Sequence, residues 1–290
     1  MAESASGPVA LITGGSRGIG AGVAVSLAGS GMHVVIVARD SQAARRTRQR
    51  MREASPEGRG DFLPADLSRM EQVTSIARDC LERFAAPDLL LHGAAAVPST
   101  RTVTPDGFET QWAVNHLAPF LLSTRLGDGG GPPVRTLSIA SKLHRNGRMQ
   151  VEEGLFEGRG YDSKQTYADT KLANVLFSRA LAARLEGTDR SSACLHPGVA
   201  ATGLLQDLQG ASSLSRAKSK LAQAVRRVEP WGLADCVATV SRLALGAEQP
   251  LPNGAYWEEG AVVEPSEPGR NAALGEALWA VSERALAPWL

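Results

Sequence analysis

The stretch VALITGGSRGIG, residues 9–20, decides the fold. Its apolar start at 9–12 is typical of a buried parallel strand, and the glycines that follow are spaced GxxxGxG where a helix begins. Glycine permits a tight turn and lets backbone N–H groups approach a pyrophosphate, which the positive end of the helix dipole also attracts. Because the turn follows the first strand of a βαβ unit, the stretch predicts a dinucleotide site rather than an ordinary tight turn without a ligand.

Strands and helices alternate along the rest of the chain. The expected strands are 9–12, 33–38, 61–64, 89–91, 134–140, 191–195 and 255–258, and the expected helices are 19–30, one from 41, 68–84, 108–124, 161–186, 231–245 and 271–286. This order predicts the α/β class: a single-domain Rossmann-type, doubly wound parallel sheet with helices on both faces. Since no linker separates two halves, we expect one NAD(P)-binding domain over 1–290, with a helical excursion at 203–227 that covers the substrate.

Composition indicates which kinds of binding partner the protein has. The residues are 43% hydrophobic and 21% charged, and a net charge of +1 gives no electrostatic signal for nucleic acid or an anionic membrane. Cys80, Cys194 and Cys236 are far apart and odd in number, and the histidines lack metal-ligand spacing, so we expect neither disulfides nor a metal. Without a signal peptide or an apolar run of ~20 residues, we expect a cytoplasmic protein with a small-molecule substrate, no nucleic acid and no membrane partner. A homo-oligomer stays open.

The residue that ends the second strand selects between NAD and NADP, because a carboxylate there binds the ribose 2′-hydroxyl and repels a 2′-phosphate. Arg39 occupies this position and Arg17 lies in the glycine turn, so we expect NADP(H) with both guanidiniums on its phosphate. Asp40 is the competing carboxylate, and an exposed Arg39 without a ligand is the alternative. Asp66 follows the third strand, where it would accept a hydrogen bond from the adenine amino group or cap the next helix with Ser68.

Tyr167 and Lys171 lie four residues apart in an expected helix, so both side chains project from one face. A phenol has a pKa of about 10, and a nearby ammonium favours the phenolate. Tyr167 would then exchange a proton with a carbonyl or alcohol oxygen while hydride moves to or from a nicotinamide. The alternative for this spacing alone is a solvated helix face.

Two further polar residues belong to this hypothesis. Ser141 follows the strand at 134–140, where its hydroxyl would orient the substrate oxygen, although strand alternation leaves Ser138 as a rival. Asn115 would be a polar relay within a helix, or else a buried asparagine bonded to the backbone.

Together these motifs resemble the short-chain dehydrogenase/reductase family. TGGSRGIG, Asn115, Ser141, the Tyr167/Lys171 pair and His196-Pro197-Gly198 follow its order and spacing, and YADTKLANVLFSRALAARLEG, LHPGVAATGLL and ALWAVSERAL are similar to its retinol-dehydrogenase-like branch. The resemblance covers nearly the whole chain. It implies that Tyr167 transfers the proton, Lys171 lowers its pKa and holds the nicotinamide ribose, Ser141 rather than Ser138 positions the substrate, and Asn115 helps a water relay.

The motifs and the resemblance together give the expected cofactor contacts. They are Gly14, Ser16, Arg17, Gly18, Ile19, Gly20, Arg39, Asp66, Leu67, Ala94, Asn115, Tyr167, Lys171, Pro197, Gly198, Val199 and Thr202. One departure from the family is plain, because His92-Gly93-Ala94-Ala95 stands where the family usually has Asn-Asn-Ala-Gly after the fourth strand.

The expected function is an NADPH-dependent oxidoreductase that interconverts a carbonyl and an alcohol on a small organic substrate. The altered motif after the fourth strand keeps a non-redox relative, performing a cyclisation or dehydration, as an alternative. An NADP-binding regulator is the other alternative, and the intact Asn-Ser-Tyr-Lys set argues against it.

Overall fold

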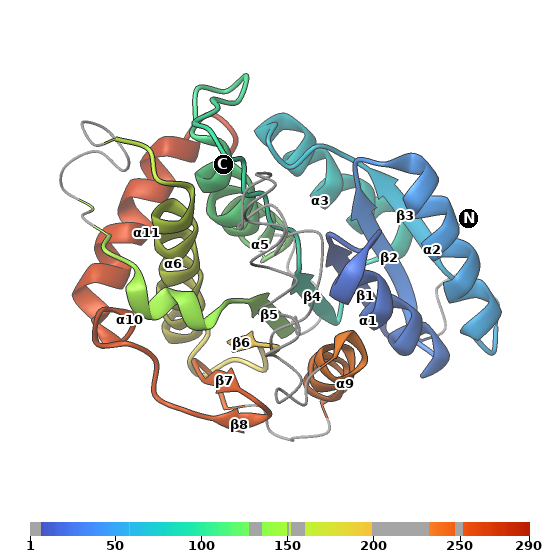
Figure 1. Cartoon of the computed structure of the whole chain (residues 1–290). Helices are drawn as coiled ribbons and strands as arrows, with labels where there is room; N and C mark the ends of the chain where they lie inside the picture. The colour runs from blue at the N-terminus through green and yellow to red at the C-terminus, as the bar shows by residue number, and fades with distance from the viewer. Residues whose placement is uncertain are drawn as a thin grey trace, which may run out of the picture.

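The structure, a computed structural model, describes residues 7–57, 59–127, 135–149, 151, 160–198, 232–246 and 252–290. Its strands are β1 (Val9–Thr13), β2 (His33–Ala38), β3 (Asp61–Pro64), β4 (Leu89–His92), β5 (Arg135–Ile139), β6 (Ser191–His196), β7 (Tyr256–Glu258) and β8 (Ala261–Val262). They form one sheet in the order β3-β2-β1-β4-β5-β6-β7-β8, parallel throughout except for the β7–β8 hairpin (Figure 1). The strand order reverses between β1 and β4, where doubly wound sheets bind their ligands.

Helices connect most of these strands. They are α1 (Gly18–Gly29), α2 (Ser41–Ala54), α3 (Met70–Phe84), α4 (Thr110–Trp112), the π-helical turn η1 (Ala113–Leu117), α5 (Ala118–Gly127), the 3₁₀ helix η2 (Lys142–Asn146), α6 (Ser163–Arg184), α9 (Leu233–Ala244), α10 (Glu267–Arg270) and α11 (Ala272–Leu286). The α6 helix is the longest of them and carries the Tyr167 and Lys171 pair.

Side-chain alternation in β1 divides the core into two layers. Leu11 joins the cluster built with α3, α5 and α6, whereas Ala10 and Ile12 join the cluster built with α1, α2 and α9. A parallel strand covered on both faces reads as a continuous apolar run, as residues 9–12 do. The C-terminal helix α11 packs against α6 on the outer side of the first layer (Figure 1). The expected fold class is therefore confirmed.

The differences from expectation lie in the connections. The helix expected over 108–124 is divided into α4, η1 and α5, and β8, η2 and α10 were not expected. The helix expected from 68 begins at Met70, whose N–H donates to Asp106 Oδ2 at 2.7 Å, so capping of this helix by Asp66 and Ser68 is wrong. The excursion expected at 203–227 lies outside the described residues.

Two of the buried histidines have a serine hydroxyl as their partner. His92 ends β4, and its Nε2 lies 2.8 Å from Ser123 Oγ, while Nε2 of His116 in η1 lies 2.7 Å from Ser282 Oγ of α11. Burial lowers the pKa of both imidazoles to about 3. Both are therefore neutral in the folded protein at neutral pH.

This burial predicts acid sensitivity of the fold. The unfolded chain binds protons on these imidazoles near pH 6.5, above their folded pKa of about 3, so stability is complete above about pH 6.5 and falls as the pH decreases. Each histidine contributes a slope of about 1.4 kcal/mol per pH unit between the two pKa values. Urea unfolding at about pH 7, 6 and 5 measures the slope. His116→Gln should remove one histidine's share, and an unchanged slope in this variant would contradict the assignment.

Candidate active site

Glycines allow the turn after β1 to pack tightly. Gly14 has φ +72°, and a Cβ there would lie 2.7 Å from Ala94 Cα in the turn after β4. A Cβ on Gly20 would lie 2.4 Å from the Gly14 carbonyl oxygen, and Gly18 has φ +55°. A larger residue at Gly14 or Gly20 would push apart the β1 turn, the β4 turn and the start of α1.

The start of α1 is open for an anion. Arg17 occupies the N-cap position and makes no side-chain capping bond, and among the described residues no acidic side chain lies in the first turn. The first N–H groups of a helix lack partners within the helix and favour a bound phosphate. Ser16 holds the turn against α2, since its carbonyl accepts from Thr47 Oγ1 at 3.2 Å. Together with the half-buried Ile19, these residues fit the pyrophosphate of a dinucleotide.

Arg17 and Arg39 are both exposed, and Arg17 is paired with an acidic side chain. Arg17 forms an ion pair with Oδ2 of Asp40, whose Oδ1 accepts from the N–H groups of Gln42 and Ala43 and caps α2. The Ala43 N–H and the Arg17 guanidinium hold the pKa of Asp40 below its usual range. The carboxylate considered as a competitor of a 2′-phosphate is thus the group that binds Arg17.

Asp66 and Leu67 follow β3 at the same edge of the sheet as the glycine turn. Asp66 Oδ1 accepts from the N–H and the hydroxyl of Ser68 at 3.0 and 2.8 Å, and Leu67 is buried. Asp66 therefore stabilises its own turn, and the adenine contact stays a prediction.

The turn after β4, whose sequence departs from the family motif, is held by hydrogen bonds to β1. Thr13 Oγ1 accepts from the N–H groups of Gly93 and Ala94 at 3.2 and 3.4 Å, and it donates to the Leu91 carbonyl. His92 packs in the core with Ser123 as its partner. Thr13 therefore braces β1 against the turn after β4. It is a site residue that sequence reasoning missed, although its place directly before the glycines was a usable signal.

Asn115 lies in the π-helical turn and is bonded to the backbone. Its Oδ1 accepts from the Ala96 N–H at 2.7 Å, and its Nδ2 donates to the Ala96 carbonyl at 3.0 Å and to Thr170 Oγ1 at 3.2 Å. Thr170 Oγ1 in turn donates to the Tyr167 carbonyl at 2.9 Å. Asn115 thereby fixes the segment after β4 to the part of α6 that carries Tyr167. Single π-helical turns occur frequently at functional sites.

Tyr167 and Lys171 are inside the protein. Their side chains belong to residues that are 5% and 2% exposed, so the alternative of a solvated helix face is wrong. Lys171 Nζ lies 5.5 Å from the centroid of the Tyr167 ring and donates to the Ile139 carbonyl at 2.7 Å. Because Ile139 ends β5, this bond places Lys171 at the carboxyl edge of the sheet.

Burial changes the titration of both groups. It raises the pKa of the Tyr167 phenol and lowers the pKa of the Lys171 ammonium to about 8. Each shift disfavours the charged form of its own group, because a low dielectric surrounds both. A phenolate formed in this setting depends on the nearby ammonium for its stabilisation, so the two side chains act as a pair.

Ser141 lies at the same carboxyl edge, two residues after Ile139 at the end of β5. It begins η2, where its Oγ accepts from the Leu143 N–H at 3.2 Å and keeps its hydroxyl proton available for another acceptor. The rival Ser138 is 1% exposed within β5, and its hydroxyl has no partner among the described residues. Pro197 and Gly198 follow β6, with φ +102° at Gly198. Val199 and Thr202 lie outside the described residues.

The described ranges contain neither a membrane-spanning helix nor a metal-binding cluster. There, no helix combines the length and apolar character needed to cross a bilayer. In the same part of the chain, no three His, Cys, Asp or Glu side chains are grouped so as to hold a metal ion.

Known proteins resemble this chain over most of its length. A short chain dehydrogenase family model matches residues 8–147. Retinol dehydrogenase 12 of Homo sapiens is 32% identical over 278 residues, covering 95% of this chain and 85% of the relative. Retinol dehydrogenase 14 of Mus musculus is 35% identical over 210 residues, covering 68% of this chain and 63% of the relative, which is less than two thirds of its length.

A solved structure has the same architecture over nearly the whole length. The crystal structure of an uncharacterized protein from Mycobacterium paratuberculosis superposes with a TM-score of 0.76 at 25% identity and covers 99% of this chain and 98% of that one. The sheet order and these similarities define a protein with a Rossmann-type fold. The chain belongs to the short-chain dehydrogenase/reductase family, in its retinol-dehydrogenase-like branch.

Asn115→Ala tests the connection between the segment after β4 and α6. The variant leaves the Ala96 backbone groups and the Thr170 hydroxyl without their partner in the protein interior, so we expect a loss of about 2 kcal/mol in the free energy of unfolding. Gln49→Ala on the exposed face of α2 is the control, with an expected change within about 0.5 kcal/mol. Urea unfolding measures both variants, and equal stabilities would refute the bracing role.

Proposed function

We propose that the protein is an NADPH-dependent oxidoreductase that interconverts a carbonyl and an alcohol on a small organic substrate. The observation that carries the proposal is the buried pair on α6, with Lys171 Nζ 5.5 Å from the centroid of the Tyr167 ring. Burying an ammonium and a phenol side by side is costly unless they have partners, and strongly shifted pKa values are typical of catalytic groups. Similarity to retinol dehydrogenases supports this class of reaction.

The side chains have distinct roles in the proposal. Tyr167 gives its phenolic proton to the substrate oxygen in reduction and takes it back in oxidation. Lys171 compensates the negative charge of the phenolate and binds the nicotinamide ribose. Ser141 donates its free hydroxyl proton to the same substrate oxygen. Asn115 keeps the segment after β4 and α6 in register and takes part in the water relay. The bound nicotinamide supplies or accepts the hydride.

The glycine turn and its neighbours hold the cofactor in this proposal. The open N-terminus of α1 binds the pyrophosphate, and Asp66 with Leu67 borders the adenine. Arg39 is exposed at the end of β2 and carries the preference for the 2′-phosphate, and Arg17 joins it after leaving Asp40. The single NAD(P)-binding domain, the small-molecule partner and the cytoplasmic location belong to the same proposal.

We propose no second function. The non-redox alternative depended on the altered motif after β4, and the turn there has its own bracing from Thr13, with His92 bonded to Ser123. The described site therefore has no disrupted feature that favours another reaction.

Tyr167→Phe tests the proton transfer. The variant keeps the buried ring and loses the hydroxyl, so we expect kcat with NADPH to fall by at least about 100-fold with little change in cofactor affinity. A panel of ketones and aldehydes with NADPH, followed at the reduced-nicotinamide absorbance band, identifies a usable substrate and gives the rates. Wild-type turnover in the variant would exclude the mechanism.

Arg39→Asp tests the choice of cofactor. A carboxylate at the end of β2 repels the 2′-phosphate and accepts from a free ribose hydroxyl, so we expect the ratio of kcat/KM for NADPH to that for NADH to fall by about 100-fold. Arg50→Asp makes the same change in net charge on the exposed face of α2 and should leave the ratio within about twofold. A ratio that moves equally in both variants would show a general charge effect and contradict the role of Arg39.

A further inference from the structure

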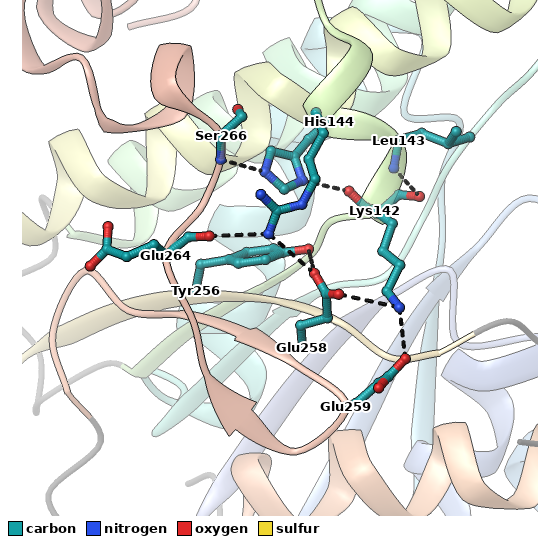
Figure 2. A network of polar contacts seen from close by, with 10 residues as sticks. Lys142, Leu143, His144, Tyr256, Glu258, Glu259, Glu264 and Ser266 are labelled. Atoms are coloured by element: carbon teal, nitrogen blue, oxygen red, sulfur yellow. Dashed lines mark hydrogen bonds and ion pairs between the residues drawn. The ribbon is translucent and has the colours of Figure 1, made fainter.

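The backbone of Ser141 is held by a histidine three residues later. His144 Nδ1 lies 2.8 Å from the Ser141 carbonyl oxygen, and its Nε2 lies 3.1 Å from the backbone nitrogen of Ser266 (Figure 2). His144 is fully buried, with its ring in edge contact with Tyr256 at a centroid distance of 4.7 Å. One imidazole thus links η2 to the C-terminal segment that follows the β7–β8 hairpin.

The two hydrogen bonds determine the tautomer of this imidazole. The Ser266 N–H is only a donor, so Nε2 of His144 accepts and carries no proton. The Ser141 carbonyl is only an acceptor, so Nδ1 carries the proton and donates it. The neutral Nδ1–H form satisfies both bonds, whereas the cation or the Nε2–H tautomer would break the bond to Ser266. Burial also lowers the pKa of His144 and favours the neutral form.

Charged groups of η2 and of the β7–β8 hairpin lie near His144. Lys142 of η2 pairs with Glu258 at 3.2 Å and with Glu259 at 2.7 Å, and Arg145 pairs with Glu258 at 3.5 Å (Figure 2). Arg145 also donates to the Glu264 carbonyl at 3.1 Å. Among the described residues, Tyr256 of β7 and His196 of β6 are further titratable groups near the imidazole. This cluster joins η2 to the hairpin at its surface and leaves the buried imidazole as the link to Ser141.

We propose that His144 is a positioning residue for Ser141, holding its carbonyl to the C-terminal segment so that the hydroxyl faces the substrate oxygen. The inference rests on the proposed function, because it acts through the role of Ser141 there. Ser141 Oγ already accepts from Leu143, so the rotation of η2 sets the direction in which the hydroxyl proton points. The imidazole fixes that rotation from the side opposite the solvent.

A double-mutant cycle separates positioning from a general effect on the fold. His144→Leu removes both hydrogen bonds, and we expect kcat to fall about tenfold while NADPH affinity, measured by fluorescence titration, stays within about twofold. In the Ser141→Ala background the same change should have no further effect on kcat. His144→Asn has the size of leucine and keeps a donor for the Ser141 carbonyl, so it should recover most of the loss. His33→Asn, at the start of β2 and away from β5, is the control without effect.

The outcomes of the cycle are distinct. Losses that multiply in Ser141→Ala, or equal losses in His144→Leu and His144→Asn, would overturn the positioning role while leaving the proposed reaction intact. Wild-type kcat in Ser141→Ala would overturn the proposed role of Ser141 and this inference with it. Thermal unfolding of each variant shows that the rates belong to folded protein.

Nitrogen NMR of histidine-labelled protein gives a readout that needs no turnover. The His144 signals, assigned by their loss in His144→Asn, should show the neutral Nδ1–H tautomer at neutral pH. An Nε2–H tautomer or a charged ring would overturn the tether.

Discussion

The burial of Lys171 is the constraint on which the rest of the site depends. An ammonium inside a protein is costly unless hydrogen bonds and opposite charge compensate for the lost water. Here Lys171 donates a hydrogen bond to the Ile139 carbonyl, and the ring of Tyr167 on the same helix lies beside the ammonium. The α6 helix maintains this position because it is packed between the sheet and α11. One buried charge therefore depends on three elements: the carboxyl edge of the sheet, α6 and α11.

The parts of this arrangement that are local in sequence could be predicted. The apolar run and glycines at 9–20 specify a strand, a turn and a helix through backbone geometry alone, and the spacing of Tyr167 and Lys171 specifies a shared helix face. Contacts between distant segments could not be predicted. The ion pair between Arg17 and Asp40 depends on how two turns approach in space, and the Ser266 bond to His144 joins residues that no periodicity relates.

The bracing around the turn after β4 explains how the chain tolerates an unusual sequence there. A hydroxyl on Thr13 and an amide on Asn115 bind the backbone of Gly93, Ala94 and Ala96 rather than particular side chains. Backbone groups are present whatever residue occupies a position. The side chain of His92 is therefore not needed to hold this turn, and it forms a separate contact with Ser123 in the core.

The π-helical turn that holds Asn115 contains more chain per turn than an α-helix, which advances by about 100° for each residue. Because the extra residue is accommodated within this one turn, removing a single amino acid between Ala113 and Leu117 would restore α-helical winding, keep the flanking residues on their present faces and eliminate the widened turn that carries Asn115. A one-codon deletion would therefore change the backbone that holds Asn115 against Ala96, even though the helices on either side keep their orientation. The contact between Asn115 and Ala96 therefore depends on the length of this turn as well as on the identity of its residues.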